Sequence, residues 1–244
     1  MRRTGPGVVA VTVTVALGLC VASACSSTRS SRGAATSEAG PTDAGVDAPL
    51  ACPPSLDEWV PPPYHHAQPP QAACSTLMIN DFYNSCLGAS ESSNACAQNW
   101  GAGEDTAHSL CQACLITPTS ATTWGPLVDY GSGNGQGTVS VNVAGCVELL
   151  DPSHDSCATS VQQADECQHQ ACDPTCPVTD STSFANWEAC VGAAAAGPCA
   201  TYLASAACVN AEDAGPAATC VSGPDFQTEF IDIATVFCGG GDGD

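Results

Sequence analysis

Positive charge is almost missing from this 244-residue chain. It has 4 Lys+Arg against 25 Asp+Glu, a formal net charge of −21, and its only cations are Arg2, Arg3, Arg29 and Arg32. Nucleic-acid binding depends on Lys and Arg contacts to phosphates. Electrostatic attraction to an anionic membrane surface needs the same residues. The sequence from residue 33 onward therefore predicts neither kind of binding.

Aromatic residues are also scarce, at 5%, and Ala supplies much of the 44% hydrophobic fraction. Because apolar burial contributes roughly 25 cal/mol per Å², an Ala-rich core is thin, and we expect crosslinks to support it. The sequence has no phosphate-binding GxxxxGK[ST] or GxGxxG, no GxSxG, no HExxH and no EF-hand calcium loop. No cofactor is predicted.

The N-terminal segment has the pattern of an export signal. Arg2 and Arg3 precede a 13-residue, mostly apolar stretch over residues 8–20, which suits a signal-peptide core and is short for a membrane span. Ala22-Ser23-Ala24-Cys25 follows, and it resembles the lipobox of bacterial lipoproteins, although that family prefers Leu at the place of Ala22. The resemblance implies lipidation of Cys25 and attachment to the cell envelope. Ordinary secretion stays open as the alternative.

Composition divides the chain into five regions. Residues 25–51 are rich in Ser, Thr, Ala, Gly and Asp and are predicted to be a disordered tether, while residues 52–73 hold seven prolines and should be extended. The regions are a signal peptide (1–24), the tether (25–51), the Pro-rich segment (52–73), a disulfide-rich mainly helical domain (74–238) and a flexible acidic tail (239–244).

Sixteen cysteines follow the tether, an even number typical of disulfide-linked exported proteins. They are candidates for up to eight structural bridges, whose connectivity stays open. A redox role for Cys111 and Cys114 and a zinc site formed by Cys167, His169, Cys172 and Cys176 are the alternatives, both disfavoured by export. The candidates are Cys52, Cys74, Cys86, Cys96, Cys111, Cys114, Cys146, Cys157, Cys167, Cys172, Cys176, Cys190, Cys199, Cys208, Cys220 and Cys238.

Periodic apolar positions predict helices, and the first has Leu77, Ile79, Phe82 and Cys86 on its apolar side. The expected helices cover residues 74–88, 105–115, 156–172, 198–209 and 224–239. Alternating residues around a Gly-rich tip predict a β-hairpin of residues 123–130 and 138–143. The predicted fold class is mainly α: a small disulfide-rich domain of helix-loop-helix modules with one β-hairpin insertion.

A weak repeat supports the modules. In each module, a first cysteine is expected to end one helix and a second cysteine to begin the next helix. A third cysteine follows later in the sequence. The three sets are Cys86, Cys96 and Cys111; Cys146, Cys157 and Cys167; and Cys190, Cys199 and Cys208.

No catalytic constellation is recognisable. Adjacent acids on a helix point in different directions, so Glu104-Asp105, Asp165-Glu166 and Glu212-Asp213 are interpreted as solvated faces. His65-His66 is interpreted as part of a polar linker and His169 as a solvated helix residue, while His108 and His154 have no recognisable partner. Because the acids lack cationic partners, we expect their pKa values to rise on average and stability to increase as pH falls from 7 toward about 4.5.

These observations predict an exported, lipid-anchored, Cys-rich envelope protein acting as a non-enzymatic binding, adhesion or structural module. Its expected partners are the membrane, through the lipid, and an unidentified extracellular ligand. Two alternatives stay open: an extracytoplasmic hydrolase with unidentified catalytic residues, and a surface protein that binds Ca²⁺ or another divalent cation through its acids.

Overall fold

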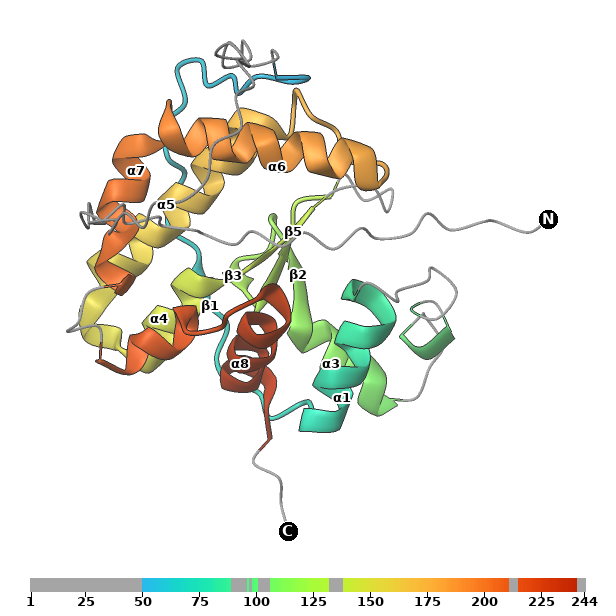
Figure 1. The fold of residues 1–244 in the computed structure, drawn as a ribbon. Helices are drawn as coiled ribbons and strands as arrows, with labels where there is room; N and C mark the ends of the chain where they lie inside the picture. The colour runs from blue at the N-terminus through green and yellow to red at the C-terminus, as the bar shows by residue number, and fades with distance from the viewer. Residues whose placement is uncertain are drawn as a thin grey trace, which may run out of the picture.

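The computed structural model describes residues 50–88, 96, 98–100, 106–131, 138–210 and 215–240. Most of their regular structure is helical, and a few short strands lie between two groups of helices (Figure 1). Helices α5, α6 and α7 lie on one side of the strands, and α1, α3 and α8 lie on the other. The predicted class, a small Cys-rich and mainly helical domain, is confirmed.

The first and last helices pack together around aromatic rings. Helix α1 (Thr76–Phe82) continues into the π-helical turn η1 (Tyr83–Leu87), and α8 (Phe226–Cys238) begins at the N-cap Asp225. Phe230 of α8 is fully buried, and its ring centre lies 6.2 Å from that of Phe82. The predicted periodicity of α8 is confirmed. Leu77 was wrongly placed on the apolar side of α1, because it is 81% exposed.

Helices α3 (Thr106–Leu115) and α5 (Asp155–Cys172) occur where the sequence predicts them. Helix α4 (Val143–Leu150) begins where the sequence predicts the end of a strand, because the predicted strand extends to Val143. The side chain of Asn142 accepts a hydrogen bond from the Gly145 amide and so begins a helix directly after the strand. The short helix η2 (Pro152–His154) then leads from α4 into α5.

The C-terminal half contains a helix that was expected only through the repeat, as a helix ending at Cys190, without a predicted start. Helix α6 (Ser181–Ala196) begins with a capping box between Asp180 and Ser183. Helix α7 (Ala200–Ala206) and the 3₁₀ turn η3 (Ala207–Asn210) fall within the predicted helix 198–209. A second 3₁₀ turn, η4 (Gly215–Val221), precedes α8.

The strands form two small sheets. In the larger one, β4 (Leu127–Asp129) pairs antiparallel with β5 (Val139–Val141), which confirms the predicted hairpin; its tip, residues 132–137, lies outside the described residues. Strand β2 (Ile116–Pro118) pairs parallel with β4. In the smaller sheet, β1 (His66–Ala67) pairs parallel with β3 (Thr123–Trp124). The parallel pairs were not predicted, because strands of two or three residues carry no readable periodicity.

All sixteen cysteines after the tether are paired, and two hydrophobic cores surround them. The larger core includes α1, α3, α4 and α8, and the smaller one includes the C-terminal half of α5 with α6. The eight bridges are Cys52–Cys176, Cys74–Cys111, Cys86–Cys96, Cys114–Cys238, Cys146–Cys220, Cys157–Cys208, Cys167–Cys199 and Cys172–Cys190.

The pairing does not follow the proposed repeat. Cys86 and Cys96 are bonded to each other, whereas the corresponding cysteines of the other two sets bond to partners elsewhere in the chain. The three sets of cysteines therefore do not form three equivalent modules.

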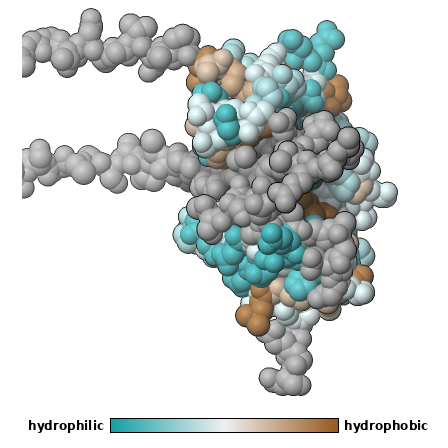
Figure 2. Space-filling view, turned by 90° about the vertical axis from the view of Figure 1, so that its right-hand side faces the viewer, coloured by the Kyte–Doolittle hydropathy of each residue, from teal (hydrophilic) through white to brown (hydrophobic). Residues whose placement is uncertain are grey.

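The Pro-rich segment packs against both cores. Cys52 and Trp59 contact the smaller core, and the Trp59 ring meets Tyr202 edge-on at 5.2 Å. Tyr64 and Ala67 belong to the larger core. On the outside, brown surface in Figure 2 lies in separate patches, and the large exposed apolar side chains, such as Val60 and Leu110, come from different segments.

Candidate functional site

A cavity of about 140 Å³ lies where β5, α4, α5 and α7 meet the segment leading into α8. Most of its wall is apolar and includes Val141, Val161 and Leu203, with the indole of Trp124. Because α4 follows β5 after one residue, the wall from this strand to this helix is continuous. Ligand sites in proteins commonly combine such apolar walls with a few polar groups.

Asp165, on α5, is a hydrogen-bonded carboxylate in the cavity wall. Ser140 donates its hydroxyl to Oδ1 at 2.9 Å, and Tyr130 donates its hydroxyl to Oδ2 at 3.1 Å. Burial, followed by the charge of Asp165, raises the pKa of Tyr130 well above its ordinary value, so this phenol keeps its proton and donates. The two donors fix the carboxylate of Asp165 at the cavity wall.

Glu229, on α8, is a second carboxyl in the same wall. Partial burial and the nearby charge of Asp165 raise its pKa to about 7. Within the described part of the chain, no hydrogen bond or ion pair to the Glu229 carboxyl is found. The group therefore exchanges its proton near neutral pH and has hydrogen-bonding capacity to spare.

Gln168, one turn after Asp165 on α5, is only 6% exposed and also lines the cavity. Its amide makes no hydrogen bond to any described residue. Of the described side-chain atoms, only Glu166 Oε2 and His169 Nε2 are fully buried without a partner, so the Gln168 amide still reaches accessible space at the cavity wall. It is therefore able to hydrogen-bond a group that enters the cavity.

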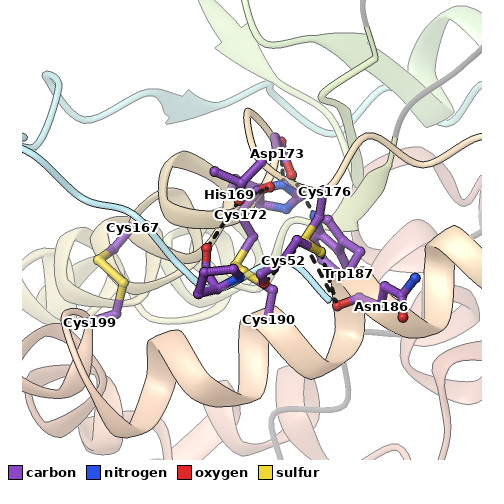
Figure 3. Close-up of a disulfide and its surroundings, with 12 residues drawn as sticks. Cys52, Cys167, His169, Cys172, Asp173, Cys176, Asn186, Trp187, Cys190 and Cys199 are labelled. Atoms are coloured by element: carbon purple, nitrogen blue, oxygen red, sulfur yellow. Dashed lines mark hydrogen bonds and ion pairs between the residues drawn. A yellow bond between two sulfur atoms is a disulfide. The ribbon is translucent and has the colours of Figure 1, made fainter. Parts of the chain in front are cut away.

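His169 points away from the cavity into a buried aromatic cluster. It is 3% exposed, its ring stacks on Tyr130 at 3.6 Å, and its Nδ1 lies 3.0 Å from Asp173 Oδ2. Trp187 donates Nε1–H to the other oxygen of Asp173 at 2.6 Å (Figure 3). The interpretation of His169 as a solvated helix residue is wrong, because α5 is covered here by α6 and by the hairpin.

The pKa of His169 results from opposing effects. Burial lowers it, but the hydrogen bond to Asp173 and the charges of Asp165, Asp173 and Glu166 raise it above its ordinary value overall. Its Nε2 is buried without a hydrogen-bond partner among the described residues, and the nearest carboxylate oxygen of Asp165 is 3.9 Å away.

Glu166 was interpreted as part of a solvated face, and this is wrong. It is 8% exposed, and its Oε1 accepts a hydrogen bond from Gln162 at 3.1 Å. Its Oε2 is buried without a partner among the described residues. Burial raises the pKa of Glu166 to about 7 against the opposing effect of the Gln162 hydrogen bond.

The hydroxyls near His169 do not form a catalytic relay. A relay needs the nucleophile on one ring nitrogen and the carboxylate on the other. Here Thr138 and Asp173 both approach Nδ1, while Ser140 donates to Asp165 instead of to the ring. The His169 ring therefore activates neither of these hydroxyls.

The cysteine alternatives are also resolved by the bridges. Cys111 and Cys114 pair with Cys74 and Cys238, so the two residues of the CxxC sequence are not linked to each other. Cys167, Cys172 and Cys176 of the suggested zinc set are each in a separate disulfide (Figure 3). Among the described residues, no group of three or more His, Cys, Asp or Glu side chains converges as a metal site.

Glu148 organises the His65-His66 region. It accepts hydrogen bonds from the Tyr64 hydroxyl at 2.9 Å and the Ala67 amide at 2.8 Å, and it lies 2.8 Å from His66 Nδ1. The ring of His65 stacks on Trp124 at 4.3 Å. These contacts make the segment a packed part of the fold, which corrects its interpretation as a linker.

The remaining predicted residues lie apart from the cavity. His154 Nδ1 is 2.6 Å from Asp151, and the ring of His108 contacts Trp100. Cys25, Glu104-Asp105 and Glu212-Asp213 lie outside the described residues.

Comparison with known proteins found no matching family model, no similar curated protein and no similar solved structure. In the described part of the chain, no single helix is long and apolar enough to cross a membrane. The helical segments Ser181–Ala196 and Ala200–Asn210, which are bent by 81° relative to each other, reach the necessary length and apolar composition only when they are taken together. The eight disulfides indicate an oxidising, extracytoplasmic environment. Further functional inference rests on the cavity.

Proposed function

We propose that this is an exported, lipid-anchored cell-envelope protein whose folded region binds a small molecule in the cavity beside α5 without transforming it. The disulfides and the lipobox-like Ala22-Ser23-Ala24-Cys25 support the location. A tether of the predicted kind after Cys25 would hold the binding domain away from the membrane.

The observation that carries the binding role is the crosslinking of the cavity walls. Cys146–Cys220 joins α4 to η4, and Cys157–Cys208 joins α5 to η3. Each of the four connected elements contributes lining residues: Ala144, Val161, Val209 and Val221. A pocket fixed in this way loses little conformational freedom on binding, which favours affinity for a small ligand.

One observation favours the hydrolase alternative. Glu229 has a raised pKa, and a second carboxyl, that of Asp165, lines the same cavity. In enzymes, a carboxyl with a raised pKa can act as a general acid beside a second carboxyl. Recovery of bound ligand in altered form would support this alternative over the binding role.

Lipid attachment is tested by substituting Cys25 in a bacterium that processes lipoproteins. We expect Cys25→Ser to move the protein from the membrane fraction to the soluble fraction. The matched control is Cys20→Ser, and this variant should stay in the membrane fraction. Equal distribution of the two variants would contradict anchoring through Cys25.

Ligand binding is tested with a fragment set containing neutral, anionic and cationic compounds, measured by thermal shift. Ala206 lines the cavity, and Ala204 is exposed on the same helix. We expect hits that Ala206→Leu abolishes by filling the cavity and that Ala204→Leu leaves unchanged. If no hit is sensitive to Ala206→Leu, the binding role is refuted.

A further inference from the structure

We propose that the cavity beside α5 takes a small organic cation, an amine with an apolar body, whose ammonium group is bound by the carboxylates of Asp165 and Glu229. This inference rests on the proposed binding function and names the class of ligand.

The Glu229 carboxyl lacks a cationic partner among the described residues. Both carboxyls line a mostly apolar cavity, and the chain has no Lys or Arg after Arg32. Among the described residues, the Glu229 carboxyl has neither a hydrogen bond nor an ion pair. A carboxylate in an apolar wall is costly unless a counter-charge reaches it. A ligand ammonium supplies this charge, whereas an anion would be repelled by both groups.

The second group is the unpartnered amide of Gln168. This residue is 6% exposed and lines the same cavity, and its side-chain amide makes no hydrogen bond within the described residues. It lies on α5 three residues after Asp165, so the amide and the carboxylate share one face of the helix. The amide oxygen can accept a hydrogen bond from an ammonium, and the amide NH₂ can donate one to a polar group of the ligand.

The remaining wall fixes the nature of the ligand body. Val128, Val141, Val161 and Leu203 are aliphatic, and Trp124 adds an aromatic ring. Aromatic rings also attract organic cations. The volume, about 140 Å³, is close to that of a cavity known to hold benzene, roughly 150 Å³. A single ring or a short branched chain therefore fits.

A bare metal ion fits less well. Ca²⁺ takes six to eight oxygen ligands, and Mg²⁺ keeps several waters. The cavity offers two carboxyl groups and wide apolar walls, which would leave such an ion poorly coordinated and its waters against aliphatic carbon. An alkylammonium needs only a few acceptors and gains from the apolar contact.

Binding is expected to depend on pH through Glu229. Its pKa is raised to about 7 by burial and by the charge of Asp165, which lines the same cavity from α5. Behind Asp165 are the phenol of Tyr130 and the ring of His169. The bound cation replaces the proton of Glu229. The affinity of the cavity for the cation should therefore rise about tenfold between pH 6 and pH 8, because the ionised fraction of a group with this pKa rises by that factor.

The test is calorimetry of the folded, disulfide-intact protein with benzylamine and its neutral counterpart benzyl alcohol. At pH 8 we expect benzylammonium to bind at least about tenfold more tightly. Glu229→Gln and Asp165→Asn should each remove most of this preference and, for Glu229→Gln, the pH dependence. Glu188→Gln, an exposed change on α6 outside the cavity, should preserve both.

Melting curves confirm that each variant is folded, and Glu229→Gln keeps the test valid if Asp165→Asn fails to fold. Equal or stronger binding of benzyl alcohol overturns the cation preference and leaves the binding function intact. If neither probe binds but the fragment screen gives hits that Ala206→Leu abolishes, the cation preference is likewise overturned and the binding function stands. A screen without such hits refutes the proposed function itself.

Discussion

Replacing Glu166 by Gln tests whether burial of this carboxyl makes the fold sensitive to pH. Its pKa is raised from 4.5 to about 7 by burial, so the folded chain keeps a proton that the unfolded chain has released. Stability from this group is fully present below pH 4.5 and is lost as pH rises through 7. One pKa unit corresponds to about 1.36 kcal/mol, so the full loss is about 3.4 kcal/mol.

The magnitude is best taken as a difference between two pH values. With these pKa values, the cost of ionising Glu166 is about 1 kcal/mol at pH 5 and about 3.4 kcal/mol at pH 8. The Gln amide can still accept from Gln162, but its NH₂ group has no partner where Oε2 was. That cost is the same at both pH values and cancels in the difference.

Glu166→Gln should therefore stabilise the fold by about 2.5 kcal/mol more at pH 8 than at pH 5, relative to the parent chain. Denaturant unfolding with the disulfides intact measures both values, and equal slopes for the two proteins validate the comparison. Glu58→Gln, which changes an exposed carboxyl, is the matched control. A change of the same size at pH 5 and pH 8 would refute the reasoning.

Three further predictions use the same unfolding assay. Replacing both cysteines of Cys146–Cys220, which are separated by 74 residues, should lower the free energy of unfolding by about 4.5 kcal/mol. For Cys86–Cys96, separated by 10 residues, the expected loss is about 2.8 kcal/mol, and the reverse order would contradict the loop-entropy argument. Trp187→Phe should cost about 1.5–3 kcal/mol by removing the hydrogen bond to Asp173, and an unchanged midpoint would contradict it. Gly223→Ala would place a Cβ 2.6 Å from the Glu229 amide nitrogen, so we expect the free energy of unfolding to fall by about 1–3 kcal/mol and benzylamine binding to weaken. Unchanged stability would show that the backbone moves apart here without cost.

The broader pH expectation, greater stability toward acid, gains support from particular residues. Glu166 and Glu229 have raised pKa values, chiefly through burial, and the raised pKa of His169 acts in the same direction. The exposed N-cap residues Asp180 and Asp225 act in the opposite direction, because hydrogen bonds from Ser183 and Thr228 lower their pKa values. Repulsion on a cation-free surface, the reason given by the sequence, is therefore secondary to burial.

Local signals predicted much of the fold. The aromatic repeat of α8 and the alternating valines of β5 were readable because each element places one face in the core. Helix α4 was missed because the valine run extends to Val143, and the decisive signal was the cap Asn142. Helix α6 is rich in Ala and has little apolar periodicity, so only the capping box at Asp180 marks its start.

The cavity could not be predicted, because its polar groups come from distant segments. Ser140, Asp165 and Glu229 lie on β5, α5 and α8, and no spacing rule connects them. Asp165 and Glu166 look alike in sequence, yet one forms the cavity wall and the other is buried beside Gln162. Which neighbour takes which role depends on the packing of α4, α7 and the hairpin around α5.

The absence of Lys and Arg connects the fold with the proposed ligand. In a chain with cations, a carboxyl such as Glu229 would be neutralised by a nearby side chain, and the cavity would be closed by an ion pair. Here neutralisation comes from a proton, at a pKa of about 7, or from a bound cation. The disulfides across the walls keep the cavity from collapsing around the unpaired carboxyls. The composition that excludes phosphate ligands thus favours an amine in the same site.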